Sequence, residues 1–345
     1  MGAKLRVPGC DGRAPNVVVT GGSAGLGRAT AVAFAEHGCN VAVIARDPGR
    51  LDDTRRDIES AGSQALTFPV DVSDAQAVKA AADTVASEWG ALDVWINCAM
   101  ATIFSPFADI KPDEFRRVTE VTCLGFVYGT MAALKHMRPR DHGTIVQVGS
   151  ALSYRAIPLQ SAYCASKFAI RGFTDALRSE LLHDKSRVRI TMVQMPAFNT
   201  PQFNWARNRM PRKPMPVPPI FQPEFGARAI LRAAVEAPRE LWVGKPAIQA
   251  ILGNFIAPGW IDRFLASDGY EGQLSPEHSD PDAPDNLFTP VPGHFGAHGR
   301  FDGQSSRTGW ITASGGAVRR FIGATALAGI AGLVAAAALS RRNGR

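Results

Sequence analysis

The sequence predicts an α/β fold in which one sheet of parallel strands is covered by helices on both faces. Short β-branched or apolar runs recur up to residue 243, and a stretch with helical periodicity follows most of them. The run 16–20 leads directly into the glycine-rich turn 21–27 and then into a helical pattern over 29–37. Strands that alternate with helices of this length imply parallel crossover connections and a sheet buried on both faces.

The turn at 21–27 is typical of a dinucleotide-binding site. Its glycines let the backbone approach a pyrophosphate closely, and the N-terminus of the following helix directs N–H groups and positive potential at it. The next strand, 40–44, ends at Ala45-Arg46-Asp47, where such a site meets the adenosine ribose. A cation near that point accommodates a 2′-phosphate, so Arg46 favours NADP over NAD, although Asp47 lies beside it.

The remaining elements place more polar residues at the same edge of the sheet. Strands are expected at 65–70, 92–96, 145–149, 188–194 and 240–243. Helices are expected at 51–61, 74–89, 112–137 and 224–236, and a further helix carries Tyr163 and Lys167 and ends at about residue 183. Parallel sheets bind ligands outside the carboxyl ends of their strands. Six strand ends deliver a polar or turn residue to that edge: Thr20, Arg46, Asp71, Asn97, Ser150 and Pro196.

Tyr163 and Lys167 lie four residues apart in a helical stretch, so their side chains share one face. An ammonium beside a phenol favours the phenolate and lowers the tyrosine pKa, which makes Tyr163 a usable acid or base. Ser150 ends an apolar run that reads as a strand, and its hydroxyl could hydrogen-bond the oxygen that Tyr163 protonates. These three residues are the candidate catalytic groups.

Two segments between 199 and 266 depart from the alternation. The Pro-rich loop 199–223 carries several aromatic residues, and a loop this long inside a compact domain is usually a lid or a substrate-binding segment. Its aromatics favour an apolar substrate, with a rigid surface excursion as the alternative. The apolar stretch 247–266 is expected to be helical and to pack on the domain, form a subunit interface or lie on a membrane surface.

The C-terminal part differs in composition. Residues 267–316 are rich in Pro, Gly, Asp, Ser and His without periodicity, which predicts a flexible linker. Residues 321–339 contain no charge and have arginines on both sides, and a helix of that length spans about 28 Å, close to the thickness of a bilayer. We therefore expect a single transmembrane tail anchor within 317–345, with a helix packed against protein as the alternative.

Composition narrows the classes of function. The formal net charge is +7, but no dense Lys/Arg block with interleaved aromatics is present, so nucleic-acid binding is not expected. The five cysteines lack the spacing of a disulfide framework or a zinc site, so no metal is expected and a reducing compartment is indicated. The N-terminal extension 1–14 does not read as a secretory signal. We expect a membrane-anchored protein whose catalytic domain is cytoplasmic.

With these motifs in this order, the chain resembles the short-chain dehydrogenase/reductase family over about residues 14–245. Thr20-Gly21-x-x-x-Gly25-x-Gly27 is similar to the family's cofactor motif, and Ser150 with Tyr163-x-x-x-Lys167 is similar to its catalytic motif. The resemblance implies a doubly wound, Rossmann-type sheet of about seven parallel strands in a domain spanning 15–246. It also implies a nicotinamide cofactor and assembly into a homo-oligomer.

The resemblance further implies roles for individual residues. Tyr163 would be the acid in reduction and the base in oxidation, Lys167 would bind the nicotinamide ribose and depress the Tyr163 pKa, and Ser150 would polarise the substrate oxygen. Asp71 and Val72 would border the adenine. The full set expected to bind the cofactor is Thr20, Gly21, Ser23, Gly25, Leu26, Gly27, Arg46, Asp71, Val72, Asn97, Ala99, Tyr163, Lys167, Pro196 and Thr200.

Three positions depart from the family's pattern. Met100 stands where the family commonly has glycine, and its bulk could narrow the site beside the cofactor. Thr122 stands where the family has an asparagine that supports a proton relay, and since a hydroxyl can donate and accept, Thr122 is a candidate relay residue of shorter reach. Ala197 replaces the glycine of a Pro-Gly turn and tolerates positive φ less well.

The sequence therefore predicts an NADP-dependent oxidoreductase that acts on a hydroxyl or carbonyl group of an apolar, lipid-like small molecule. Two alternatives stay open. One is a reductase of small xenobiotic carbonyls that is anchored only for location. The other is a non-catalytic NADP-binding sensor or scaffold at a membrane, for which Met100 and Thr122 argue.

Overall fold

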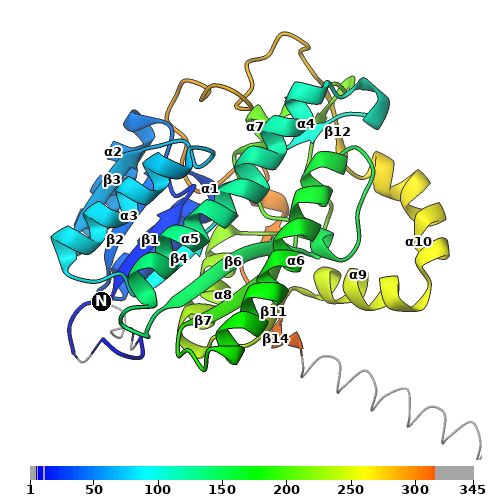
Figure 1. Ribbon diagram of the computed structural model, residues 1–345. Helices are drawn as coiled ribbons and strands as arrows, with labels where there is room; N and C mark the ends of the chain where they lie inside the picture. Colours follow the sequence, from blue (N-terminus) through cyan, green and yellow to red (C-terminus); the bar gives the residue numbers. More distant parts are fainter. Residues whose placement is uncertain (1–4, 6, 11, 315–345) are drawn as a thin grey trace, which may run out of the picture.

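The computed structural model describes residues 5, 7–10 and 12–314, and its centre is one eight-stranded sheet (Figure 1). The strand order is β14-β11-β7-β6-β4-β1-β2-β3. The seven parallel strands are β1 (Asn16–Thr20), β2 (Asn40–Ala45), β3 (Ala65–Pro69), β4 (Val94–Asn97), β6 (Thr144–Ser150), β7 (Arg189–Met195) and β11 (Glu240–Val243). The Rossmann-type α/β sheet is thus present, and β14 (Ile311–Ala313) extends it with an antiparallel edge strand.

Helices cover both faces of this sheet. The helices α1 (Gly25–Glu36), α2 (Pro48–Ser60) and α8 (Pro223–Glu236) pack on one face, and α3 (Ala75–Trp89), α4 (Pro112–Thr119), α5 (Gly125–Met137) and α6 (Ser161–His183) pack on the other. Strand β1 shows why both faces of the sheet need to be covered. Val17 and Val19 join the first core and Val18 joins the second, because successive side chains of a strand point to opposite faces.

The helix predicted over 112–137 is interrupted. A π-helical turn, Glu120–Leu124, separates α4 from α5 and carries Thr122 at its centre. Such turns are uncommon and are often found at functional sites. Here the turn brings the backbone between the two helices next to the segment that follows β4, where Thr122 contacts Ala101.

The loop 199–223 is built from short elements that pair with distant parts of the chain. These are α7 (Gln202–Trp205), β8 (Arg207–Asn208), β9 (Arg212–Pro214) and β10 (Ile220–Phe221). Their partners are β5 (Ile103–Phe104), β12 (Leu274–His278) and β13 (Ser305–Ser306). Beside them, α9 (Lys245–Ile256) and α10 (Pro258–Phe264) form an arm that projects from the sheet (Figure 1). We call residues 245–264 the α9–α10 arm.

The region predicted to be a flexible linker differs from that prediction in its described part, 267–314. It begins in the second π-helical turn (Leu265–Gly269), contributes β12, β13, β14 and a 3-10 turn (Asp302–Gln304), and buries Leu287 and Phe301. Two further 3-10 turns lie elsewhere, at Phe107–Asp109 and Ala151–Ser153. Pro, Gly and Asp do not prevent order here because the segment lies on the domain, so tertiary contacts replace periodic secondary structure.

The predicted fold class included a transmembrane helix, and this part requires correction. Among the residues that the structure describes, no helix has both the length and the apolar character needed to cross a membrane. The stretch 321–339, on which the prediction rested, lies outside the described residues. The fold class is therefore a Rossmann-type α/β fold without an assigned membrane span.

Candidate active site

A cavity of about 870 Å³ opens at the carboxyl edge of the parallel strands. One half is lined by the glycine turn and by residues after β2, β3 and β4, and we call it the cofactor half. The other half is lined by residues of the loop 199–223 and of the α9–α10 arm, and we call it the substrate half. Ser150, Tyr163 and Lys167 line the same cavity, so the candidate catalytic residues share it with both halves.

The three catalytic candidates converge from two elements. Ser150 is the last residue of β6, and Tyr163 and Lys167 lie on the first turns of α6. The Ser150 hydroxyl accepts from the N–H of Leu152 at 3.1 Å and lies close enough to the Tyr163 phenol to act on its pKa. The Lys167 ammonium donates to the carbonyl oxygen of Val148 at 2.7 Å and lies 5.4 Å from the centre of the Tyr163 ring.

Burial is the largest influence on the pKa values of Lys167 and Tyr163. It lowers the pKa of Lys167 to about 8, since the charged ammonium is desolvated. It also raises the pKa of Tyr163, an effect that the hydrogen bond from Ser150 only partly offsets. The lowered Tyr163 pKa expected from Lys167 is not found in the chain alone, where desolvation of the phenolate raises that pKa. Tyr163 is held as a neutral phenol, the form that donates a proton.

The glycine turn is shaped as a cradle in which side chains do not fit. Gly21 has φ +69°, and a Cβ added there would lie 2.6 Å from the Cα of Ala99. A Cβ on Gly27 would lie 2.2 Å from the carbonyl oxygen of Gly21. Helix α1 begins at Gly25 without a side-chain cap, so its N-terminal amides face the cavity uncapped by the chain's own side chains. A pyrophosphate fits such a cradle.

Two residues expected to bind the cofactor are instead buried behind the cavity wall. The Thr20 hydroxyl accepts from the N–H groups of Cys98 and Ala99, at 3.0 and 3.3 Å. The Asn97 amide donates to Gln147 at 2.9 Å and accepts from the Trp95 indole at 2.7 Å. Neither lines the cavity: Thr20 holds the backbone of Cys98 and Ala99, which does line it, whereas Asn97 connects β4 to β6 beneath the cavity wall.

Thr122 behaves in a similar way. Its hydroxyl accepts from the N–H of Ala101 at 3.0 Å and donates to the carbonyl oxygen of the same residue at 2.9 Å. The side chain is fully buried and does not line the cavity. Its single proton is therefore used in holding the segment after β4, and the relay role stays a prediction. Met100, by contrast, does line the cavity beside the cofactor half.

The adenosine end of the cofactor half is polar and already hydrogen-bonded. Arg46 donates to the carbonyl oxygens of Leu287 and Phe288, at 3.4 and 3.0 Å, and to that of Asn286. Asp71 forms an ion pair with Arg117 and accepts from Ser73. Burial raises the Asp71 pKa, but the hydrogen bonds from Arg117 and Ser73 outweigh it and hold the carboxyl below its ordinary value.

The other residues predicted to bind the cofactor line the cavity. Those that line the cavity are Gly21, Ser23, Gly25, Leu26, Gly27, Arg46, Asp71, Val72, Ala99, Tyr163, Lys167, Pro196 and Thr200. Cys98 lines it too, and burial raises the pKa of its thiol to about 12, so it is an uncharged wall residue. All five cysteines are free. Within the described part of the chain no cluster of His, Cys, Asp and Glu could hold a metal ion.

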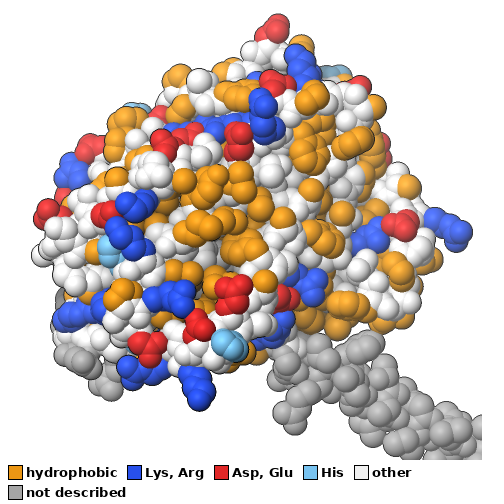
Figure 2. Space-filling model, viewed as in Figure 1, with side chains coloured by type: hydrophobic (Ala, Val, Ile, Leu, Met, Phe, Trp, Pro, Cys, Tyr) orange, Lys and Arg blue, Asp and Glu red, His pale blue; other side chains and the backbone are white. Residues whose placement is uncertain are grey.

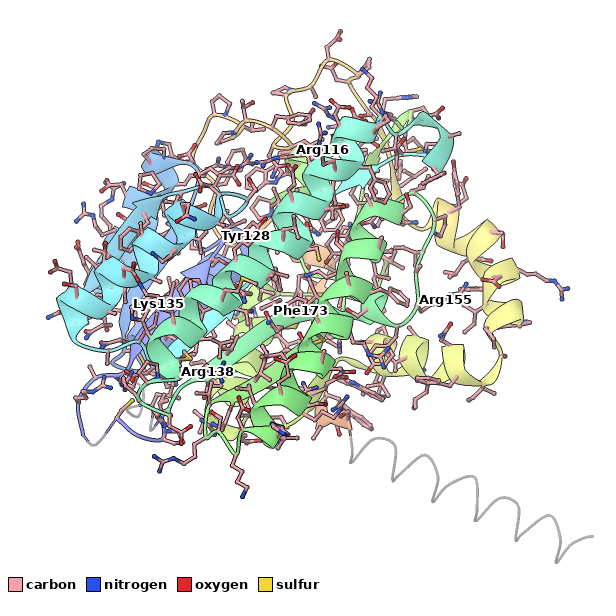
Figure 3. All side chains as sticks on the ribbon, viewed as in Figure 1. Arg116, Tyr128, Lys135, Arg138, Arg155 and Phe173 are labelled. Carbon is pink, nitrogen blue, oxygen red and sulfur yellow. The ribbon has the colours of Figure 1, made fainter. Side chains whose placement is uncertain are left out.

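The substrate half contains residues that sequence reasoning did not single out. Leu152 and Ile157 line it from the turn before α6, and Trp260 and Phe264 line it from the arm, stacked at 5.7 Å between ring centroids. Arg155, which Figure 3 shows between α6 and the arm, forms an ion pair with Asp262 of α10. The arm was predicted to be apolar, but its place over the cavity follows from tertiary contacts that no local pattern reveals.

Known proteins are similar to this chain in sequence and in fold. A sequence model of the family described as short chain dehydrogenase matches residues 15–210. The chain is 30% identical over 330 residues to YxnA, an uncharacterized oxidoreductase of Bacillus subtilis. The matched residues make up 94% of this chain and 90% of that protein. A 3-dehydrosphinganine reductase of Danio rerio is 30% identical over 229 residues, covering 64% of this chain and 68% of that protein.

A solved structure supports the same relationship. It is that of a protein from Sinorhizobium meliloti 1021 assigned as a short-chain alcohol dehydrogenase. It superposes with a TM-score of 0.52 at 32% identity, covering 55% of this chain and 74% of that chain.

Proposed function

Because the chain belongs to the short-chain dehydrogenase/reductase family, we propose that this oxidoreductase moves a hydride between NADP and a hydroxyl or carbonyl group of an apolar small molecule. The observation that carries the proposal is the placement of Ser150, Tyr163 and Lys167 in one cavity with the glycine turn and an apolar wall. The nicotinamide ring supplies or accepts the hydride when the cofactor is bound. The chain supplies the proton and the geometry.

In the direction of reduction, Tyr163 donates its phenolic proton to the substrate oxygen. Burial keeps this phenol protonated, so it is available as a general acid. The Ser150 hydroxyl hydrogen-bonds the same oxygen and polarises the carbonyl. Lys167 uses one of its three donors on Val148, which leaves two for a ribose hydroxyl. In oxidation the Tyr163 phenolate accepts the proton, and since burial disfavours this form, the raised pKa of Tyr163 favours reduction near neutral pH.

The choice of NADP rests on Arg46. Three of its N–H groups bind peptide carbonyls, and since a guanidinium carries five, two remain for a 2′-phosphate. Arg50, which is buried nearby and also lines the cavity, forms an ion pair with Asp47, so the preference rests on Arg46. Charge-assisted hydrogen bonds to a phosphate are strong, so we expect a lower KM for NADPH than for NADH.

An apolar substrate is supported by the walls of the substrate half. Hydrocarbon surface is presented there by Leu152, Ile157, Val217 and Phe264, which line the same cavity as Tyr163. One relative is named for the reduction of 3-dehydrosphinganine, so that ketone is a first compound to test.

We also propose that two copies pair through α5 and α6. These helices expose Met131 (64%), Phe168 (43%) and Leu182 (72%), and Tyr128 and Phe173 are labelled on the same helices in Figure 3. Figure 2 shows apolar side chains over this part of the visible face. Light scattering at micromolar concentration measures the mass directly, and a monomer would contradict the pairing.

The experiment that tests the function is a substrate panel on the purified protein. Alcohols, aldehydes and ketones of increasing chain length, with 3-dehydrosphinganine among them, are assayed with NADPH and with NADH. Turnover that rises with chain length and favours NADPH supports the proposal. Tight NADPH binding without turnover of any compound would instead identify a non-catalytic nucleotide-binding protein.

A further inference from the structure

Residues 286–301 run past the cofactor half of the cavity, and we call them the strap. Both ends of the strap are anchored to the domain. At the first end Leu287 is fully buried, and the N–H of Asn286 donates to the carbonyl oxygen of Trp205 at 3.0 Å. At the second end Phe301 is buried against Phe203, and its N–H donates to the Asn199 side chain at 2.9 Å. The middle, 292–296, is largely exposed.

The strap binds directly to two residues expected to hold the cofactor. The N–H of Gly25, the first residue of α1, donates to the carbonyl oxygen of Gly296 at 3.1 Å. Arg46 donates to the carbonyl oxygens of the first strap residues, including that of Phe288 at 3.0 Å. These contacts lie at opposite ends of the region between the glycine turn and the adenosine end of the cavity. The strap therefore spans that region.

Weaker contacts hold the middle of the strap. The Arg28 guanidinium donates to the carbonyl oxygen of Phe295 at 3.1 Å. The ring of Phe295 meets that of Trp205 edge-on, with 4.6 Å between centroids, and Arg50 lies over both rings. His294, exposed on the strap, contacts the Asp53 carboxylate of α2 at 2.7 Å. Figure 1 shows this part of the chain passing the upper end of the sheet near α2.

The strap also forms part of the cavity wall. Asn286 and Pro290 line the same cavity as Ser23, Arg46 and Asp71. We propose that the strap is the outer wall of the cofactor site and that a dinucleotide enters and leaves only when its middle lifts. Exchange of the cofactor is then slow and set by the strap, whereas substrate passes through the other half of the cavity. The inference rests on the proposed cofactor, whose binding is measured separately below.

The distribution of contacts makes such an opening feasible. The two ends are anchored by buried apolar side chains, so they stay in place when the middle opens. The middle is held by a few polar contacts and one aromatic pair at the surface, and segments of this kind open locally without global unfolding. When the strap is closed, its carbonyl oxygens accept from Arg28 and from three N–H groups of Arg46, and the other two N–H groups of Arg46 are left for a cofactor phosphate.

The test measures how fast the cofactor leaves. The full chain is loaded with NADPH and mixed rapidly with excess NADP, and the loss of bound NADPH fluorescence gives the dissociation rate. Phe295 does not itself line the cavity, and Phe295→Ala removes its ring contact with Trp205, so we expect dissociation about tenfold faster than in wild type. Hydride transfer within the preloaded complex should keep its wild-type rate. Phe107→Ala, which removes an exposed aromatic paired with Phe115, is the matched control and should change neither rate.

The outcomes separate the two claims. If wild type shows no NADPH binding in an equilibrium titration, the proposed cofactor is wrong. If NADPH binds and Phe295→Ala releases it at the wild-type rate with an unchanged melting temperature, the strap proposal is overturned. Should Phe295→Ala unfold, His294→Ala decides the matter, because this side chain is 83% exposed and its loss removes only the contact with Asp53. That variant should release NADPH faster than wild type, and an unchanged rate would overturn the proposal.

Discussion

In the cofactor half of the cavity the critical surfaces are backbone, whereas in the substrate half they are side chains. Gly21 and Gly27 leave room for a ligand because the chain itself would collide with any Cβ added there. Trp260 and Phe264 reach the cavity from an arm about a hundred residues beyond Tyr163, and they are 64% and 46% exposed. Backbone constraints tolerate almost no substitution, while an exposed arm can change its side chains and still fold.

From this difference we expect hydride transfer and substrate selectivity to depend on different parts of the cavity. Substitutions at the junction of the two halves should abolish hydride transfer, those in the cofactor half should weaken nucleotide binding, and those in the substrate half should change KM for the substrate alone. The predictions below test that division, beginning with the largest effect.

Tyr163→Phe, at the junction, should lower kcat about a thousandfold, because general acid catalysis contributes effects of that order. The variant keeps the ring and loses only the hydroxyl, so the NADPH dissociation constant should stay within about twofold of wild type. Steady-state kinetics and a fluorescence titration measure the two quantities. Undiminished turnover would remove Tyr163 from the reaction.

The sequence predicted the cofactor half well because its determinants are local. The pattern of a strand, a glycine turn and a helix within about twenty residues predicted the β1–α1 unit, whose Gly21, Gly25 and Gly27 line the cavity. The catalytic pair was predictable for the same reason, since Tyr163 and Lys167 share one helix face. Thr20 and Asn97 were assigned to the cofactor from their strand ends and from the family resemblance, yet hydrogen bonds hold both side chains behind the cavity wall.

The substrate half and the strap could not be predicted in this way. Residues 267–314 have no periodicity, and their order comes from pairing with segments that lie 60 to 270 residues earlier, as Gly25 with Gly296 shows. The pKa of Tyr163 was predicted with the wrong sign because the sequence shows which charge is adjacent but not how much solvent is excluded. Burial by residues distant in the sequence determines both the order of residues 267–314 and the pKa of Tyr163.

Gly27→Ala should weaken the binding of NADPH, because it changes the cofactor half alone. The added Cβ would lie 2.2 Å from the carbonyl oxygen of Gly21, and relieving such overpacking costs about 1–3 kcal/mol. The NADPH dissociation constant should rise at least about tenfold. Gly172→Ala, in the middle of α6, is the control, since nothing lies within 4 Å of its added Cβ. Equal affinities for the two variants would refute the backbone argument.

The pH dependence should report Lys167. A lysine is charged below its pKa, and since burial lowers that pKa to about 8, the ammonium is present at neutral pH and lost as pH rises. The value of kcat/KM for NADPH, which reflects the free protein, should therefore fall about tenfold between pH 7 and pH 9. The Tyr163 phenol stays neutral across this interval because its pKa is raised. A flat profile to pH 9 would contradict the assignment.

Trp260→Ala should give the smallest and most selective effect. The indole stacks on Phe264 at an interplanar angle of 9° and lines the substrate half, so its loss removes apolar surface only there. Because more than half of the side chain already faces water, we expect KM for a long-chain substrate to rise about fivefold. The KM for the shortest substrate that turns over and the affinity for NADPH should stay unchanged. A uniform loss across chain lengths would mean that the arm acts on folding and that selectivity resides deeper in the cavity, beside Leu152.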